Sequence, residues 1–260
     1  LPARELFQEL ARLIEASEDL PFCSRLVQTL SGILHTSPAL WELRDLLRAA
    51  SRDPAGAELF HALHRAWCHN PVALLALCLL AQAYEHAAAL IGAFSELDVD
   101  LDLLLQLDRL VQLIESPVFA HLRLHLLEPE KHPLLIKAVF GLLMLLPQSA
   151  AFRTLQQRLS PVPQLGLLRL SSPSMAEGGA RDKGQGAKVD PAPGPGPAKL
   201  LDARALQAAF VEVQARHMEH ARAMQERERL ARTSEAGSGA GPGPDAKPSG
   251  SQGSSVGAAP

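Results

Sequence analysis

"HPLLIKAVFGLLMLLPQSAAF", residues 132–152, contains a nearly unbroken apolar run that the folded protein has to bury. Eleven of the fourteen residues from Leu134 to Pro147 are apolar, and only Lys137, Gly141 and the closing proline interrupt them. On a helix these side chains point in every direction, so the helix must be covered on all sides. We therefore expect it in the central seam of a helical stack, at or beside a contact with a second copy of the chain.

This stretch is too short to cross a bilayer. A membrane-spanning helix takes roughly 20 apolar residues, whereas Pro133 and Pro147 bound this run and Lys137 lies inside it. A membrane-inserting bundle, in which the run pairs with residues 71–81 as a hairpin, stays open as an alternative.

Helix starts are marked along the rest of the chain by a capping residue followed by proline. Ser, Asp and Asn side chains accept hydrogen bonds from the free N–H groups of a first turn, and proline suits the first helical position. Four such pairs occur, Ser37-Pro38, Asp53-Pro54, Asn70-Pro71 and Ser116-Pro117. With Pro21 and Pro133 they form a nearly evenly spaced series, and the one larger gap, from Pro71 to Pro117, has room for three helices.

Apolar residues between these starts follow the helical period. One face carries the set Leu103, Leu107, Leu110, Val111 and Ile114. Short helices joined by turns of two to four residues lie antiparallel to their neighbours, and repeated pairs of them form HEAT-like or armadillo-like units. We therefore predict an all-α fold, a HEAT/armadillo-like stack of about ten short antiparallel helices. A compact bundle has the same periodicity and remains the alternative.

Composition divides the chain into four parts. The sequence predicts a helical-repeat domain over residues 1–160 and a flexible linker over 161–198, where Gly, Pro, Ser and Ala dominate. A charged helix that docks on the stack or on a partner is expected over 199–233, and a disordered tail over 234–260.

The charged helix has a seam of its own. Its members step by four and three residues, namely Leu206, Phe210, Val213, His217, His220 and Met224. Two histidines in the seam weaken it as a coiled coil. We expect the helix to dock on the stack or on a partner, and the alternative is a helix solvated on all sides.

Overall composition argues against a nucleic-acid-binding protein and favours a cytoplasmic one. The formal net charge is -3 and only 4% of residues are aromatic, which does not suit a protein that tracks nucleic-acid phosphates. The cysteines, Cys23, Cys68 and Cys78, lie within apolar runs and without metal-site spacing, as expected of a reduced, cytoplasmic protein. The start of the sequence shows neither a signal-peptide nor a transit-peptide pattern.

Candidate catalytic and metal-binding groups are sparse. His61, His64 and Cys68 share one helical face, and His121 and His125 have the i, i+4 spacing of zinc pairs, but both sets lack further ligands. We expect structural or solvated histidines there, and a small metal-dependent helical hydrolase remains the alternative.

A third candidate motif lies near the end of the chain. "GSSVG", residues 253–257, matches the nucleophile-elbow pattern without the flanking strand and helix that such an elbow requires. The sequence therefore predicts no enzyme, no cofactor and no metal.

Three runs of sequence resemble a known family. They are "WCHNPV" (67–72), "LDRLVQLIESPVFAHLRLHLL" (107–127) and "KAVFGLLMLLPQSAAF" (137–152), and they closely resemble the carboxy-terminal region of the ArPIKfyve (Vac-fourteen) family. That family comprises the HEAT-repeat scaffolds of the PIKfyve phosphoinositide kinase complex.

The resemblance implies a non-catalytic scaffold that self-associates and holds two enzymes together. One is a PIKfyve-type lipid kinase, and the other is a Sac-family phosphoinositide phosphatase, so that phosphatidylinositol 3,5-bisphosphate turnover is controlled. It also implies peripheral association with endosomal or vacuolar membranes through the complex. Residues expected at partner or self-association contacts are Leu135, Val139, Phe140, Leu142, Leu143, Leu146, Leu206, Phe210, Val213 and Met224.

Overall fold

The computed structural model describes residues 2–94, 100–162 and 200–238, and these contain helices and no strand. The expected linker and tail lie largely outside the described residues. The helices are α1 (Ala3–Ala16), α2 (Leu20–Thr36), η1 (Pro38–Leu40), α3 (Trp41–Arg48), α4 (Pro54–Trp67), α5 (Pro71–Leu80), α6 (Tyr84–Ala93), α7 (Leu101–Glu115), η3 (Pro117–Phe119), α8 (Ala120–His125), α9 (Pro133–Leu145), α10 (Ala150–Leu159) and α12 (Ala203–Ser238). The predicted all-α fold is confirmed.

The predicted helix starts hold, although the caps differ in kind. Asp53 and Asn70 accept hydrogen bonds from backbone N–H groups three residues on, as expected. Ser37 and Ser116 instead precede single 3-10 turns, and their side chains do not cap. The helix that contains Pro21 begins with Asp19, whose side chain accepts a hydrogen bond from the Phe22 N–H.

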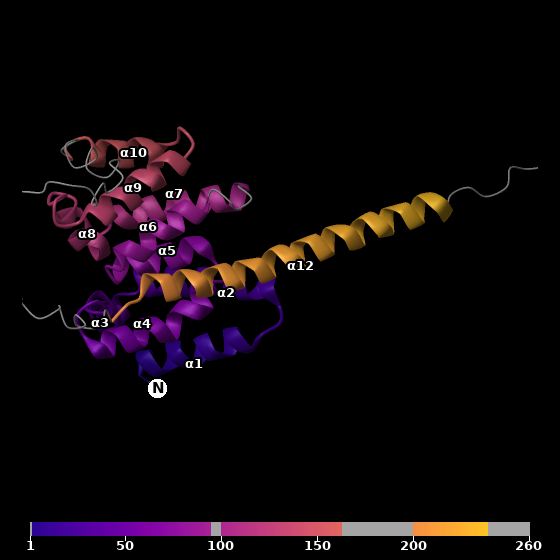
Figure 1. The fold of residues 1–260 in the computed structure, drawn as a ribbon, viewed down its shortest axis with the longest axis horizontal. Coiled ribbons are helices and arrows are strands. Elements are labelled where there is room, and N and C mark those ends of the chain that lie inside the picture. Colours follow the sequence, from indigo (N-terminus) through magenta and orange to yellow (C-terminus); the bar gives the residue numbers. More distant parts are fainter. Residues whose placement is uncertain (1, 95–99, 163–199, 239–260) are drawn as a thin grey trace, which may run out of the picture. The chain divides into compact units, whose positions relative to one another are not determined.

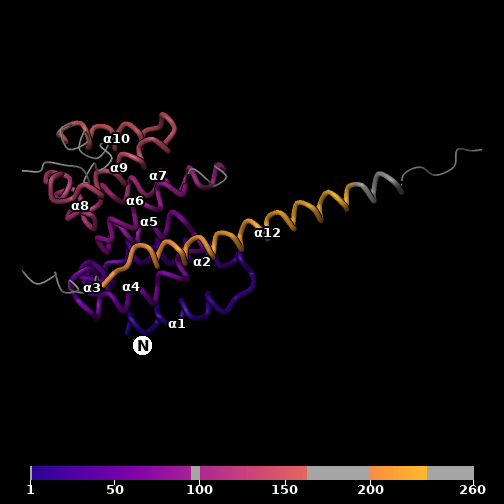
Figure 2. Tube along the Cα trace, in the orientation of Figure 1, coloured from indigo at the N-terminus to yellow at the C-terminus, as the bar shows by residue number. Residues whose placement is uncertain are grey.

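Antiparallel pairs of helices build the stack. The pairs are α1 with α2, α4 with α5, α6 with α7, and α9 with α10, and they follow one another from the lower to the upper end in Figures 1 and 2. First members of successive pairs pack together, most closely α1 on α4 and α6 on α9. Second members form the other layer, in which α2, α5, α7 and α10 pack in order. These two layers distinguish a HEAT-like stack from a compact bundle.

The second half of the stack repeats the first at a constant offset in the sequence. The shift that carries the bounds of α5, Pro71–Leu80, onto those of α10, Ala150–Leu159, also carries η1 onto η3. The same shift carries the start of α4 at Pro54 onto the start of α9 at Pro133. The short helices α3 and α8 occupy equivalent places after the 3-10 turns. The stack is therefore two equivalent halves.

The most apolar helices lie at the centre of this arrangement. Residues 72–80 of α5 are all buried, because α2, α4, α6 and α7 surround it. The α9 helix is close to α6, where Gly141 lies against the Ile91 side chain and leaves no room for a Cβ atom. Burial of each large apolar side chain contributes about 1.5 to 3 kcal/mol, so this seam carries much of the stability of the stack.

The chain divides into two compact units. Residues 1–217 form the first, which includes the stack and the beginning of α12, and the second starts at Met218. Within the second unit α12 continues to Ser238, and the side chains of residues 218–232 are exposed.

Candidate interaction surface

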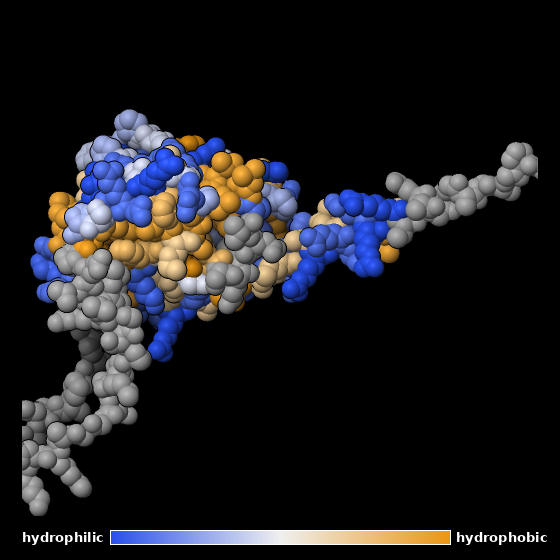
Figure 3. Space-filling model, turned by 90° about the horizontal axis from the view of Figure 1, so that it is seen from above, coloured by the Kyte–Doolittle hydropathy of each residue, from blue (hydrophilic) through white to orange (hydrophobic). Residues whose placement is uncertain are grey.

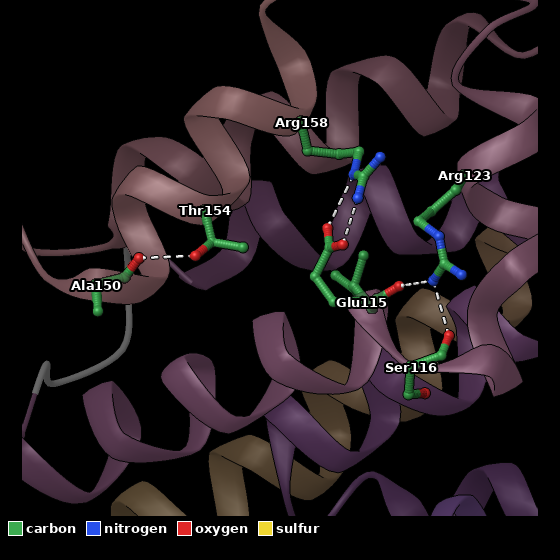
Figure 4. Close-up of polar contacts among 7 residues, drawn as sticks. Glu115, Ser116, Arg123, Ala150, Thr154 and Arg158 are labelled. Atoms are coloured by element: carbon green, nitrogen blue, oxygen red, sulfur yellow. Dashed lines mark hydrogen bonds and ion pairs between the residues drawn. The ribbon is translucent and has the colours of Figure 1, made fainter.

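Contacts of Arg158 and Ser149 attach α10 to α7 at the upper end of the stack. Arg158 of α10 donates two hydrogen bonds to the Glu115 carboxylate of α7, at 3.0 and 2.5 Å, and Figure 4 shows the paired geometry. This hydrogen bonding holds the pKa of Glu115 below its usual value and raises that of Arg158. Ser149 caps α10 and donates to Asp108 of α7 at 3.2 Å. The last pair of helices is thus attached to α7 at both ends of α10.

Arg123 joins α8 to the end of α7. Its Nη1 donates to the carbonyl oxygens of Ile114 and Ser116 at 2.6 and 2.7 Å, as Figure 4 shows. Arg44 does the same in the first half, donating to Leu34 and Ser37 at 2.9 and 2.6 Å. Each arginine therefore satisfies carbonyls that the preceding helix leaves free at its end. Sequence reasoning missed both arginines, although each follows a Ser-Pro pair by the same spacing.

The α9 helix buries most of the residues that the sequence proposes for contact with a second molecule. Leu135, Val139, Leu142 and Leu146 are buried inside the stack. Phe140 and Leu143 are half-buried.

Other side chains of α9 remain accessible. Leu134 is 37% exposed and Met144 is 87% exposed. The run of apolar residues is therefore covered mainly by its own chain, and a limited part of it stays open to a partner.

Apolar side chains gather over the upper end of the stack. The space-filling view in Figure 3 shows them spread across this face. The exposed large apolar residues of α7, of α8 with the turn that follows it, and of α9 are Leu101, Leu105, Leu124, Leu127, Leu134 and Met144. Apolar side chains that gather on one exposed face can mark an interaction site in soluble proteins. We call this face the apolar end, and it is the candidate interaction surface.

The beginning of α12 packs on the outer face of α4. Its seam residues Leu206, Phe210 and Val213 are buried and belong to the same core as the stack. Met224, the last residue proposed for the seam, is 43% exposed in the second unit.

Polar contacts along α4 fix the register of α12. Arg65 pairs with Glu212 at 3.2 Å. The amide of Gln214, a residue that sequence reasoning missed, donates to the Cys68 carbonyl at 2.7 Å.

A histidine pair closes the same contact. His69 Nδ1 lies 2.9 Å from His217 Nε2, so one ring donates to the other. Burial, and then the neighbouring His217, lower the pKa of His69 to about 4. The neutral ring of His69 is therefore part of how α12 is held.

The three candidate metal ligands on and just after α4 do not converge on one point. His64 Nε2 lies 2.9 Å from His86 Nε2 of α6, while His61 Nε2 lies 3.0 Å from the Leu200 carbonyl oxygen. Cys68 Sγ approaches the other nitrogen of His64 at 3.7 Å. Burial lowers the pKa of His64 to about 3 and that of His86 to about 4, and it raises the pKa of the Cys68 thiol.

The rings of the second candidate pair, His121 and His125, lie edge to face, but each has a different polar partner. His125 Nδ1 lies 2.7 Å from the Tyr84 hydroxyl, and His121 Nε2 lies 3.4 Å from the Leu79 carbonyl oxygen. In the described part of the chain, no group of three or more His, Cys, Asp or Glu side chains is arranged to hold a metal ion. The "GSSVG" motif lies outside the described residues.

No helix in the described ranges combines the length and the apolar character needed to cross a bilayer. The hairpin of residues 71–81 with the α9 run is instead taken up by the stack, since α5 and most of α9 are buried there.

Comparison with known proteins gives the family. The family described as "Vacuolar protein 14 C-terminal Fig4p binding" matches residues 1–162, the whole two-layered stack. The chain belongs to this Vac14 family. It is 49% identical over 164 residues to a VAC14 homolog of Arabidopsis thaliana and 49% identical over 159 residues to one of Schizosaccharomyces pombe. It is 39% identical over 160 residues to the vacuole morphology and inheritance protein 14 of Saccharomyces cerevisiae.

These alignments take in 63, 61 and 62% of this chain but only 22, 19 and 18% of the relatives. The chain therefore spans about a fifth of the length of the curated Vac14 relatives it matches. No solved structure matches the chain. Helix α12 lies beyond the residues that the Vac14 family description covers.

Proposed function

We propose that this chain is a non-catalytic scaffold region that holds a Sac-family phosphoinositide phosphatase of the Fig4p type. The observation that carries the proposal is the match of a Fig4p-binding family to residues 1–162. Those residues form a helical stack whose exposed apolar end offers a protein-binding surface. Stacked helical repeats present extended surfaces of this kind to partners.

The proposed role extends to the complex around the phosphatase. Bound next to a PIKfyve-type lipid kinase, the phosphatase would control phosphatidylinositol 3,5-bisphosphate turnover, and the complex would be peripheral on endosomal or vacuolar membranes. The name of the yeast relative, which refers to vacuole morphology and inheritance, supports a vacuolar setting.

Binding of the purified phosphatase to the full chain tests the proposal. We expect the two proteins to elute together from a sizing column at micromolar concentrations, with Leu124→Asp and Leu127→Asp weakening the complex. Leu13→Asp, on an equally exposed leucine of α1, is the matched control and leaves binding unchanged. Separate elution of the wild-type chain and the phosphatase overturns the proposal.

Self-association is the second part of the proposal. The α9 residues first proposed for it are mostly buried, so the contact with a second copy is carried instead by the exposed leucines of α7, Leu101 and Leu105. We expect the purified chain to sediment as an oligomer at tens of micromolar concentration and Leu101→Asp with Leu105→Asp to make it a monomer. A monomeric wild-type chain contradicts this part.

A further inference from the structure

The two halves of the stack differ in what covers their outer faces. In the first half α12 packs along α4, beside the exposed positions His61 and Arg65. By the offset that carries Pro54 onto Pro133, these positions correspond to Phe140 and Met144 on α9. The docking face of α4, which is polar at these positions, has an apolar counterpart in the second half.

Burial confirms that α4 and α9 present the same face to the core. Buried residues Phe60, Leu63 and Trp67 of α4 map onto Val139, Leu142 and Leu146 of α9, which are buried as well. The outward faces therefore correspond too.

The outer face of α9 is open in the structure. Met144 is 87% exposed and Phe140 is half-buried. The solvent-facing positions of a helix are usually polar when nothing packs on them. Lys137 lies one turn before Phe140, is exposed, and forms no ion pair with the described residues. Its counterpart Glu58 is paired with Arg4. The open face is thus an apolar strip with one cation at its start.

We propose that the outer face of α9 is a docking site for an amphipathic helix of a partner protein. The helix lies parallel to α9, as α12 lies along α4, and places an apolar side chain on Met144 where α12 places Glu212 on Arg65. An acidic residue near the start of the partner helix faces Lys137. This inference goes beyond the proposed function and does not depend on the phosphatase being the partner.

The chemistry of the strip argues against α12 of a second copy as the occupant. Docked in the equivalent register, α12 would bring the Glu212 carboxylate onto the Met144 thioether and lose the Arg65 partner. Covering a carboxylate with apolar surface costs free energy when no cation compensates it. A helix with leucine, methionine or phenylalanine at that position has no such cost.

A labelled peptide tests the site on the full chain. The probe is the segment of residues 200–218 carrying Glu212→Leu, with a fluorophore at its start, and fluorescence anisotropy reports binding. We expect the wild-type chain to bind this probe at tens of micromolar concentration. The unaltered segment should bind about tenfold more weakly, because loss of a central contact typically has an effect of this size.

Chain variants locate the bound probe. Met144→Asp weakens binding of the probe about tenfold or more, while Leu13→Asp, on an exposed leucine of α1, leaves it within about twofold of wild type. Met144 is almost fully exposed, so its substitution leaves the fold intact, and an unchanged urea midpoint verifies this. If Met144→Asp binds the probe as tightly as the wild type, the probe displaces α12 from α4 instead, and this result overturns the proposal.

Two further outcomes count against the site. If the probe does not bind at about 100 μM, a concentration above the dissociation constant expected for it, the proposal is overturned. Sedimentation of Met144→Asp gives the other: if this change converts an oligomer into a monomer, a second copy of the chain covers the face instead. An unchanged oligomeric state together with weakened probe binding supports the partner helix.

Discussion

Arg44 and Arg123 show how one side chain can end a helix and begin the next. Each reaches back to two carbonyl oxygens at the end of the preceding helix, so that α3 and α8 are placed across the ends of α2 and α7. Arg44 is 7% exposed, and its charge is offset by these carbonyls. A hydrogen bond from a charged donor is stronger than one between neutral groups.

Replacement of Arg44 tests this arrangement. Arg44→Met keeps the apolar stem and removes the donors, leaving carbonyl groups without partners, so we expect a loss of about 1 to 3 kcal/mol in the free energy of unfolding. Urea titration gives the value. Arg109→Met is the control, because Arg109 is exposed and makes no hydrogen bond with the described residues. Equal stability of the two variants would show that the carbonyl contacts are unimportant.

The buried pair His64 and His86 makes the stack sensitive to acid. Their folded-state pKa values, about 3 and about 4, lie below the ordinary value of 6.5 because burial disfavours the charged rings. As the pH falls below 6.5, these two imidazoles therefore become protonated in the unfolded chain while they stay neutral in the folded chain. The stability contributed by the neutral pair is complete above pH 6.5 and is lost as the pH falls toward 4.

Each of these histidines lowers the free energy of unfolding by about 1.4 kcal/mol per pH unit within that window. We expect urea midpoints to fall steadily from pH 6.5 to pH 4.5. His86→Gln should make the slope shallower by about one proton, whereas His220→Gln, at an exposed position of α12, should not change it. A slope that is the same in His86→Gln and wild type would contradict the assignment.

At the scale of elements, the contact of α6 with α9 depends on a glycine. A Cβ atom at Gly141 would lie 2.3 Å from Ile91 Cγ2. At Gly32 on α2 the same addition meets nothing within 4 Å. These two helical glycines therefore respond to the same substitution in opposite ways.

Gly141→Ala should reduce the free energy of unfolding by about 1 to 3 kcal/mol through overpacking. Gly32→Ala should raise it by about 0.5 to 1 kcal/mol, since alanine is the better helix former. Ile91→Ala makes room for the new methyl group, so Gly141→Ala should cost less stability in the Ile91→Ala background than in the wild type. Thermal or urea unfolding of the wild type, the two single variants and the double variant gives the coupling energy. Simple additivity of the two substitutions would contradict the close approach.

The first part of α12 is held on the stack by its buried seam. Phe210→Ala removes the largest side chain of its buried seam, a change that costs about 3 to 5 kcal/mol in a core. Because α12 follows the stack in sequence, we expect this loss to release residues 203–217 rather than to unfold α4.

Hydrogen exchange measures that release. In Phe210→Ala the amides of residues 203–217 should exchange faster, and those of α5 should keep their protection. Val211→Ala, at a position 53% exposed on the same helix, is the control. Protection of residues 203–217 equal to wild type in Phe210→Ala would show that the seam does not hold α12.

At the scale of the whole molecule, much of the fold follows from local signals. The Asp-Pro and Asn-Pro pairs place helix starts correctly, because capping and proline geometry act within one turn. The Ser-Pro pairs mark 3-10 turns that lead into α3 and α8, without a side-chain cap. The apolar run of α9 also indicates correctly that this helix needs cover. Which neighbour supplies the cover is set by packing between distant residues, here Gly141 on Ile91, and no periodicity encodes that.

The partners of the histidines could not be predicted for the same reason. His64 meets His86 across two helices, and His69 meets His217 from α12. A one-dimensional spacing groups His61, His64 and Cys68 instead, but only His64 and Cys68 contact each other, while His61 faces the Leu200 carbonyl oxygen. The repeat that relates the two halves was open to sequence analysis, since Ser37-Pro38 and Arg44 recur as Ser116-Pro117 and Arg123.

We propose that the stack of residues 1–162 is the platform that binds a phosphatase partner. Hydrogen exchange of the full chain, measured with and without the purified Fig4p-type phosphatase, tests this proposal. We expect added protection in the stack, strongest in the exposed segments of α8 and α9, and none in residues 218–232. Protection confined to residues 218–232, or no change anywhere in residues 1–162, would contradict it.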